Sequence, residues 1–273
     1  MNTGEFDFEE ENKRISKNTS SIKNKILVMS GKGGVGKTTV AVNLACSMAK
    51  KGYKTGLLDI DLHGPNVPKM LGIDNIQMAA EDGQILPYKF SDNLRVCSLA
   101  MLGATTDKPI IWRGPLKAAA IRQMLGDVRW GELDYLFLDC PPGTGDEILT
   151  AFQSVSDWRG AVVVTTAQEV ALDDAKRSLV FAKQVGLPVL GIIENMSGFI
   201  CPHCGKESEI FKKGSGELLA KTYGTEFLGR IPIEMGIVTL EDSGKAALLA
   251  GTEGAGAKAF DAAAEKIKKL SKF

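Results

Sequence analysis

A glycine-rich run near the N-terminus has the residue types and the spacing of a phosphate-binding loop, G-x-x-x-x-G-K-T. Glycines let backbone N–H groups turn inward around an anion, and a following helix adds the partial positive charge of its N-terminus. A lysine can then reach the outer phosphates of a nucleotide, and a threonine hydroxyl can ligate Mg²⁺. The residues predicted to bind ATP in this way are Gly31, Lys32, Gly33, Gly34, Val35, Gly36, Lys37, Thr38 and Thr39.

Carboxylates end two apolar runs further along the chain, where a phosphate-bound metal could use them. Asp139 follows the run Tyr135–Leu138 and is expected to hold Mg²⁺ together with Thr38. Asp59 and Asp61 end another run, and ligands of parallel sheets bind at this edge. We therefore expect Asp61 to orient the attacking water and Asp59 to support the metal shell. The alternative for Asp59 is a cap on the following turn.

Two cysteines separated by two residues, Cys201 and Cys204, can present two thiolates to one metal centre. A cluster or a structural zinc normally needs four ligands, and the chain has no second such pair. A twofold dimer with two cysteines from each subunit would complete the set. A zinc site shared by the dimer and a redox dithiol are the alternatives. The remaining cysteines are expected in the core, in an apolar strand and in the turn after Asp139: Cys46, Cys97 and Cys140.

The elements that must position these residues are predicted from short apolar runs separated by helical patterns. Runs at 26–29, 55–59, 135–139, 161–165 and 189–193 are apolar on both faces, which is typical of parallel strands covered on both sides. Helical patterns lie at 39–51, 146–155 and 171–185, and Gly186 ends the last of them. This alternation predicts an α/β fold with a single doubly wound, mostly parallel sheet.

Composition predicts one domain behind a flexible leader. Residues 1–24 are polar, charged and aperiodic, whereas residues 25–273 carry the phosphate loop and the Cys-x-x-Cys loop. Lys+Arg and Asp+Glu are 33 each, so no nucleic-acid partner is expected. No apolar stretch approaches the roughly 20 residues that span a bilayer, so no membrane partner is expected either. Five cysteines without an export signal indicate reduced thiols and a cytoplasmic location.

The second lysine of the loop, Lys32, carries a resemblance to a known class. The run Gly-Lys-Gly-Gly-Val-Gly-Lys-Thr resembles that of the deviant Walker A ATPases, P-loop NTPases that include the MinD, ParA and nitrogenase-iron-protein relatives. The resemblance implies that Lys32 acts across a dimer interface on the partner's nucleotide, and that ATP holds two subunits face to face. It also implies that Asn195 faces the adenine and that the loop at Pro232 covers the other side of the base.

Three further stretches make the chain similar to the Mrp/ApbC or Nbp type of iron–sulfur cluster carrier ATPase, from about Lys25 to the C-terminus. They are Asp-Ile-Asp-Leu-His-Gly-Pro-Asn-Val-Pro at 59–68, Asp-Cys-Pro-Pro-Gly-Thr-Gly-Asp at 139–146, and Glu-Asn-Met-Ser-Gly-Phe-Ile-Cys-Pro-His-Cys-Gly at 194–205. The resemblance implies a homodimeric, Mg²⁺-dependent ATPase with Lys32, Lys37 and Asp61 as catalytic residues. Cys201 and Cys204 would hold a labile 4Fe–4S cluster between the subunits. Donor or scaffold proteins would supply the cluster, and apo iron–sulfur proteins would receive it.

The alternative function is that of a MinD- or ParA-like positioning ATPase that acts at a membrane or on a polymer. Its supporting feature is the basic final helix, in which Phe260, Ile267 and Leu270 recur at helical spacing opposite lysines. The structural interpretation of the same stripe is that it packs on the sheet.

Overall fold

The computed structural model describes residues 8–62, 64–102, 114–201, 204, 206–211 and 213–271. Its helices are α1 Phe8–Thr19, α2 Lys37–Lys50, α3 Val67–Met70, α4 Gly114–Asp127, α5 Asp146–Ser154, α6 Glu169–Val185, α7 Ser215–Tyr223, α8 Met235–Asp242 and α9 Ala255–Leu270, with a 3₁₀ turn at Leu99–Leu102. Its strands are β1 Ile22–Met29, β2 Thr55–Asp59, β3 Ala80–Glu81, β4 Gln84–Ile85, β5 Tyr88–Lys89, β6 Leu94–Ser98, β7 Leu133–Asp139, β8 Gly160–Thr165, β9 Val189–Glu194, β10 Phe199–Ile200, β11 Glu207–Ser208 and β12 Phe227–Arg230.

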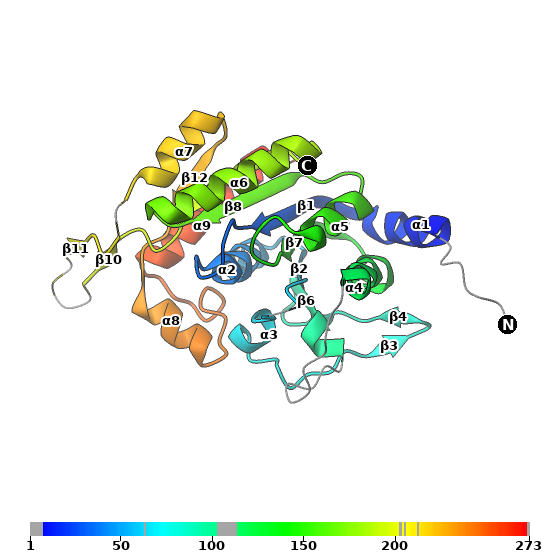
Figure 1. The fold of residues 1–273 in the computed structure, drawn as a ribbon. Helices are drawn as coiled ribbons and strands as arrows, with labels where there is room; N and C mark the ends of the chain where they lie inside the picture. Colours follow the sequence, from blue (N-terminus) through cyan, green and yellow to red (C-terminus); the bar gives the residue numbers. More distant parts are fainter. Residues whose placement is uncertain are drawn as a thin grey trace.

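A twisted sheet runs through the described part of the chain, with strand order β12-β9-β8-β1-β7-β2-β6-β5. The seven strands from β12 to β6 pair in parallel, and β5 joins the edge antiparallel to β6. Because the strands are parallel, their carboxyl ends, and the loops that follow them, meet at one edge of the sheet. Figure 1 shows helices on both sides of this sheet. The predicted doubly wound, mostly parallel α/β sheet is confirmed.

Alternation along the strands divides the core into two clusters, one on each face. In β1, Ile26 and Val28 belong to one cluster, and Leu27 and Met29 belong to the other; all four side chains are fully buried. Helices α2, α3, α8 and α9 contribute to the first cluster, and α1, α4, α5, α6 and α7 contribute to the second; α6 also places Ala171 in the first. The central strands β2, β7 and β8 therefore have no solvent-exposed face, which is the reason their sequences read as continuous apolar runs.

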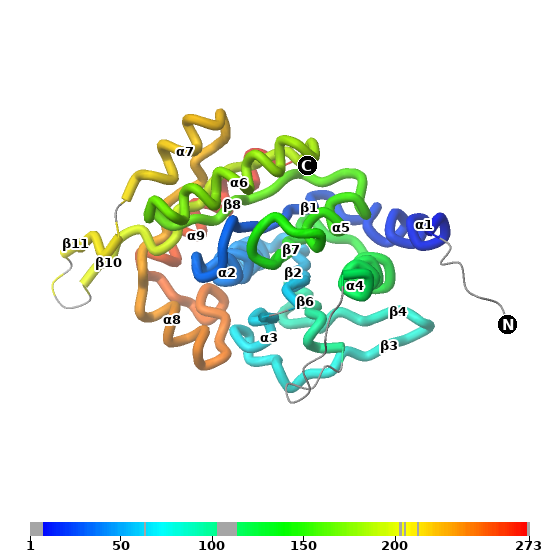
Figure 2. The backbone as a smooth tube through the Cα atoms, in the orientation of Figure 1, coloured from blue at the N-terminus to red at the C-terminus, as the bar shows by residue number. Residues whose placement is uncertain are grey.

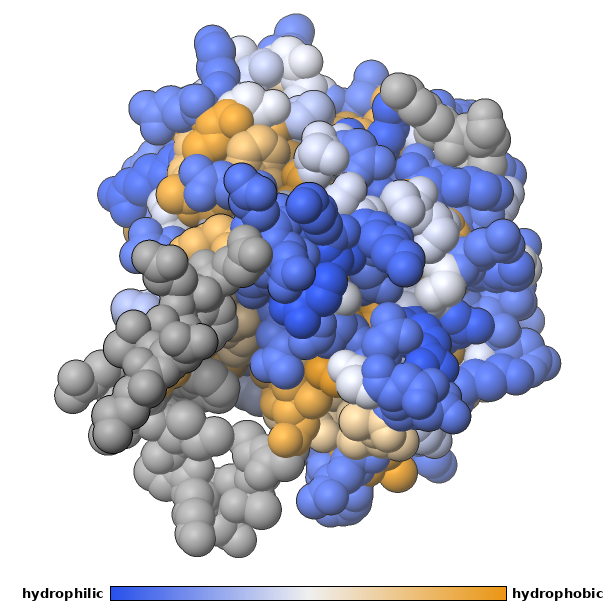
Figure 3. All heavy atoms as spheres, turned by 90° about the vertical axis from the view of Figure 1, so that its right-hand side faces the viewer, coloured by the Kyte–Doolittle hydropathy of each residue, from blue (hydrophilic) through white to orange (hydrophobic). Residues whose placement is uncertain are grey.

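The prediction of a flexible leader is wrong for the described residues from Phe8 onward. Helix α1 packs against α4, and Ile15 is fully buried in the second cluster. The Asn18 amide donates to the carbonyl oxygens of Leu125 and Val128, at 2.8 and 2.7 Å. Residues 1–7 lie outside the described residues. Figure 3 views the side on which α1 lies, and its surface is mostly hydrophilic. Only Ile15 and Thr19 of α1 are buried, so the polar composition of this segment reflects a solvated helix face.

The final helix α9 is part of the core rather than a free amphipathic face. It packs against α2 and β12, and its apolar side chains Phe260 and Ile267 are 1% and 0% exposed. The structural interpretation of its apolar stripe is therefore confirmed. None of the helices in the described ranges has both the length and the apolar character needed to cross a bilayer.

Candidate nucleotide site and cysteine hairpin

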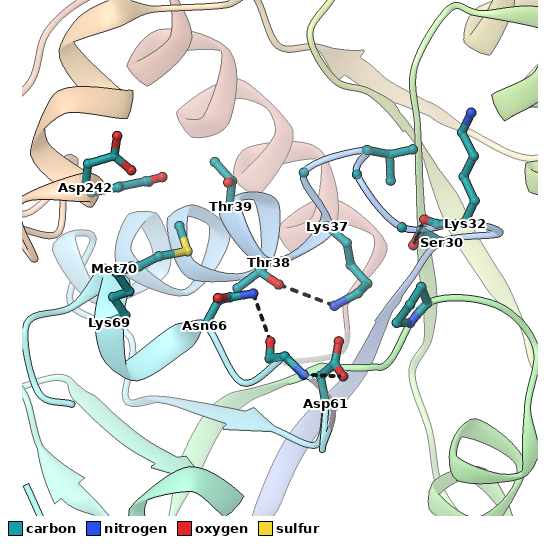
Figure 4. A pocket seen from close by; sticks show the side chains of 17 residues that line it. Ser30, Lys32, Lys37, Thr38, Thr39, Asp61, Asn66, Lys69, Met70 and Asp242 are labelled. Carbon is teal, nitrogen blue, oxygen red and sulfur yellow. Dashed lines mark hydrogen bonds between the residues drawn. The ribbon is translucent and has the colours of Figure 1, made fainter. Parts of the chain in front are cut away.

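The glycine-rich run connects the end of β1 to the start of α2, at the carboxyl edge of the sheet. Gly34 and Gly36 have φ of +79° and +78°, a left-handed conformation that lets the loop fold back around its own N–H groups. The side chain of Asn195 adds a second constraint at Gly36, because a Cβ there would lie 2.2 Å from the Asn195 amide nitrogen. A cavity of about 450 Å³ opens above the loop, and every residue from Ser30 to Thr39 except Gly31 lines it (Figure 4).

The buried lysine of this cavity, Lys37, is held by a buried carboxylate. Lys37 Nζ lies 2.5 Å from one Asp139 oxygen, and the Thr38 hydroxyl donates to the other oxygen over 2.7 Å. Burial lowers the pKa of Lys37, but the Asp139 charge outweighs this effect and raises it above the ordinary value. Lys37 is therefore a charged hydrogen-bond donor at the N-terminus of α2. The structure brings Lys37, Thr38 and Asp139 together, and their roles toward phosphate and magnesium stay predictions.

The carboxylates that end β2 lie beside this pair. Asp59 is in register with Asp139 on the neighbouring strand and is fully buried. Its oxygens accept hydrogen bonds from the Asp61 N–H at 3.0 Å and from the Ser98 hydroxyl at 3.1 Å. Burial, with the nearby Asp139 charge, raises the pKa of Asp59 to about 8. A divalent cation close by would favour the ionised form of both acids.

Asp61 is the carboxylate that reaches the cavity wall. It lines the space above the loop, and one of its oxygens accepts the Gly64 N–H over 3.3 Å (Figure 4). Asp59 and Asp139 do not line it, and both lie beneath its floor. Asp61, predicted to orient the water, therefore faces the cavity, whereas Asp59, predicted to support the metal shell, is buried beneath it. Both roles stay predictions.

A second, more apolar cavity of about 320 Å³ adjoins the first and contains both predicted base contacts, Asn195 and Pro232. The two cavities share part of their walls, including Thr39, Met70 and Glu241. The Asn195 amide donates to the carbonyl oxygen of Val35 in the phosphate loop over 2.9 Å. A polar compartment joined to an apolar one matches the phosphates and the base of a nucleotide.

Several residues of these walls carry no role predicted from the sequence, although Asn66 and Pro142 lie within the stretches 59–68 and 139–146. They come from α3 and the loop before it, from the turn after β7, and from α8: Asn66, Lys69, Met70, Pro142, Glu241 and Asp242. Glu241 lines both cavities, as Met70 and Asp242 do. Only the packing of α8 against α3 brings it there.

Glu241 also makes stability depend on pH. Its carboxylate accepts a hydrogen bond from the Asn43 amide over 2.5 Å, and burial raises its pKa from 4.5 to about 7. The folded chain therefore retains a proton that the unfolded chain releases, and the resulting stabilisation is lost as the pH rises from about 4.5 to 7. Glu241→Gln removes this loss and can still accept the Asn43 bond. We expect the variant to gain on the order of 2 kcal/mol over wild type at pH 8 relative to pH 5.

Urea unfolding of both proteins at pH 5 and pH 8 measures this difference. Asp242→Asn, one position along and also on the cavity wall, is the matched control; it removes only the smallest of the contributions that raise the Glu241 pKa, so its pH-dependent gain should be much smaller. An equal stability difference at both pH values would contradict the expected ionisation of Glu241.

Lys32 lies at the rim of the phosphate cavity and is half-buried. Figure 4 shows its side chain pointing away from Lys37 and Thr38. Its ammonium group makes no ion pair with the part of the chain that the structure describes. With this orientation, the Lys32 ammonium group points away from the Lys37 and Thr38 side chains that would bind the nucleotide of the same chain.

The predicted cysteine pair lies on the β10–β11 hairpin, which projects at the left edge of Figure 2. Cys204 is exposed and Cys201 is partly exposed, and the Cys201 N–H donates to the Lys206 carbonyl oxygen over 3.0 Å. The other three cysteines are buried as expected, in α2, in β6 and directly after β7: Cys46, Cys97 and Cys140. Within the described residues, no group of three or more His, Cys, Asp or Glu side chains could hold a metal ion.

The parallel sheet, the glycine loop that opens α2 and the lysine-threonine-aspartate cluster define a P-loop nucleotide-binding protein. The chain matches the family described as "NUBPL iron-transfer P-loop NTPase" over residues 21–268 and belongs to that family. A protein of Methanocaldococcus jannaschii named "Iron-sulfur cluster carrier protein" is 52% identical over 231 residues, 85% of this chain and 80% of that protein. "Cytosolic Fe-S cluster assembly factor CFD1" of Yarrowia lipolytica is 46% identical over 238 residues, 85% of this chain and 82% of its own length.

Solved structures agree with this assignment. A nucleotide-binding protein of Archaeoglobus fulgidus in complex with ADP superposes with a TM-score of 0.76 at 39% identity, covering 86% of this chain and 92% of that one. The cell division ATPase MinD of Pyrococcus furiosus has a TM-score of 0.65 at 24% identity, over 91% of this chain and 100% of its own, which shows a shared fold alone. The MinD-like positioning alternative is not favoured, because the relatives at about 50% identity carry iron–sulfur names.

Proposed function

We propose that this chain is a cytoplasmic, ATP-hydrolysing carrier that binds a labile 4Fe–4S cluster between two subunits and transfers it to apo-proteins. The observation that carries the proposal is the placement of its cysteines. Cys201 and Cys204 reach solvent on one hairpin beside the base cavity, whereas the other three are sealed in the core. The family membership and the names of the relatives support the same function.

The residues around the first cavity fit a magnesium nucleotide. The loop offers N–H groups and a helix N-terminus for phosphates, and Thr38, Asp139 and Asp59 are hard oxygen donors of the kind that Mg²⁺ prefers. Mg²⁺ would supply charge compensation for the phosphates there. In the structure the Lys37 ammonium group forms an ion pair with Asp139. Bound phosphates would attract this ammonium group toward the cavity, and the Asp139 oxygen would then be available to the metal.

Hydrolysis would use the groups that face the cavity. Asp61 lines it and would orient the attacking water, while Lys37 would stabilise the charge that develops on the outer phosphates. Lys32 would perform the same task on the partner's nucleotide, which its orientation in Figure 4 favours. Asn195 and Pro232 would contact the adenine.

The thiols of one chain fit half of a cluster site. Cys201 and Cys204 supply two soft donors, and a 4Fe–4S cluster takes four. A homodimer that brings two hairpins together would complete the set with no further cysteine. A zinc ion shared in the same way would use the same thiolates, so the bound metal has to be identified by analysis.

Transfer to an acceptor tests the carrier function. The chain is reconstituted anaerobically with iron and sulfide, freed of unbound ions, and mixed with an apo-ferredoxin in the presence of an iron chelator. We expect the acceptor to gain its cluster spectrum about as fast as the carrier loses its own, because the cluster passes directly between thiolates. If the chelator captured the iron before the acceptor gained its spectrum, direct transfer would be ruled out.

A further inference from the structure

A buried side chain, Glu194, binds both ends of the cysteine hairpin to the end of a sheet strand. This glutamate is the last residue of β9, begins the stretch 194–205 that contains both cysteines, and is fully buried. Its Oε1 accepts the Ser197 hydroxyl at 2.5 Å and the Gly214 N–H at 3.0 Å, and its Oε2 accepts the Gly216 N–H at 2.6 Å. Arg230 on the neighbouring strand β12 lies 3.6 Å away.

These partners lie on both sides of the segment that carries the two thiols. Ser197 comes before β10, whereas Gly214 and Gly216 come after β11, at the N-terminus of α7. A negative side chain at a helix N-terminus is favoured by the helix dipole, so the contact also fixes where α7 begins. The Glu194 carboxylate therefore clamps the entry and the exit of the cysteine hairpin to the same strand end.

The residue next to the clamp faces the nucleotide. Asn195 lines the base cavity and donates to the phosphate loop at Val35. Met196, between Asn195 and Ser197, has a φ of +54°, which is uncommon for a residue with a side chain and leaves the turn little freedom to relax.

The opposite wall of the base cavity is tied to the same turn by backbone hydrogen bonds. The Ile231 N–H donates to the Glu194 carbonyl oxygen over 2.9 Å, and the Ser197 N–H donates to the Ile231 carbonyl oxygen over 2.9 Å. The Ile233 N–H donates to the Gly198 carbonyl oxygen over 2.8 Å. Pro232 lies between Ile231 and Ile233 in the sequence, and all three line the cavity. Both walls of the base cavity are thus continuous with the base of the hairpin.

We propose that Glu194 is a positioning residue that couples nucleotide in the base cavity to the arrangement of Cys201 and Cys204. An adenine that hydrogen-bonds to Asn195 competes with Val35 for its amide and displaces the strand end. Because every Glu194 oxygen is bonded, the displacement passes to Ser197, Gly214 and Gly216 rather than being absorbed at the clamp. The coupling rests on the proposed function for its purpose, but its physical basis is the hydrogen-bond network alone.

Thiol alkylation measures this coupling without iron or sulfide. Iodoacetamide labels Cys201 and Cys204 with and without ADP, and mass spectrometry quantifies the label on each cysteine. The protein concentration is one at which light scattering gives the same molar mass with and without ADP. In wild type we expect ADP to change both labelling rates by about fivefold, a typical size for coupling between two sites. Glu194→Gln, which cannot accept all three donors, should label at rates that ADP leaves unchanged, although it still binds ADP.

Two controls separate coupling from unfolding. Glu217 lies in the first turn of α7 and, like Glu194, pairs with Arg230, but it does not contact the ends of the hairpin. Glu217→Gln therefore removes one negative charge near α7 and should retain the wild-type response to ADP. The buried cysteines, Cys46, Cys97 and Cys140, report unfolding if they become labelled. Should Glu194→Gln label them, Ser197→Ala, which removes one of the three donors, should still reduce the ADP response.

A wild-type chain whose hairpin thiols do not respond to ADP would overturn the proposal. So would a folded Glu194→Gln protein with the full wild-type response. A chain that takes up no cluster but shows an ADP response lost in Glu194→Gln would disprove the carrier function and leave this coupling intact.

Discussion

Lys37→Ala is expected to lower ATP turnover by about a thousandfold, the scale of removing a charged donor that stabilises developing charge. The side chain is 7% exposed and holds Asp139 at 2.5 Å, so its loss also leaves two buried acids without their nearest cation. Without Lys37, burial favours protonated Asp59 and Asp139, which weakens them as metal ligands. Nucleotide binding and hydrolysis should therefore fall together.

Phosphate release measures the turnover, and titration with a fluorescent ATP analogue measures the binding. Lys50→Ala is the matched control, because it removes an exposed lysine from the other end of the same helix α2. A Lys37→Ala protein that keeps more than about a tenth of wild-type turnover would contradict the phosphate contact proposed for this lysine.

Cys201→Ser and Cys204→Ser are each expected to abolish stable cluster uptake, because a hydroxyl replaces a thiolate in a set that already needs two chains. Both side chains reach solvent and lie outside the core, so we expect the free energy of unfolding to change by less than about 0.5 kcal/mol. ATP turnover should remain, since neither residue lines a nucleotide cavity.

Iron and sulfide analysis after anaerobic reconstitution measures the uptake, and phosphate release is assayed on the same sample. Cys46→Ala serves as the control, because it deletes a thiol that is fully buried in α2 and keeps both hairpin thiols. Equal loss of uptake and turnover in a folded serine variant would contradict the separation of the two sites.

The strands and the phosphate loop could be predicted from the sequence because their signals are local. Strands buried on both faces give continuous apolar runs, and β2, β7 and β8 lie where those runs predicted them, with only small differences in their ends. The loop motif likewise contains its own strand, its glycines and its lysine within a single stretch, so no tertiary information is needed to find it.

Helix α1 and Glu241 could not be predicted because their environment is made by distant residues. The polar face of α1 resembles an unstructured leader until α4 covers Ile15 and accepts the Asn18 hydrogen bonds. Glu241 is one acid among many in the sequence, and only the position of α8 places it between the two cavities. Glu194 is similar, since the donors that hydrogen-bond to its carboxylate lie up to 22 positions along the chain.

The central claim is that two chains hold one cluster through four thiolates. The most direct measurement is the iron and sulfide content of anaerobically reconstituted protein, with the molar mass of the same sample from light scattering and its Mössbauer spectrum. The account predicts a dimer with about two irons and two sulfides per chain and the spectrum of a 4Fe–4S cluster. A protein with both hairpin thiols intact that remains monomeric with ATP and takes up no iron would contradict it.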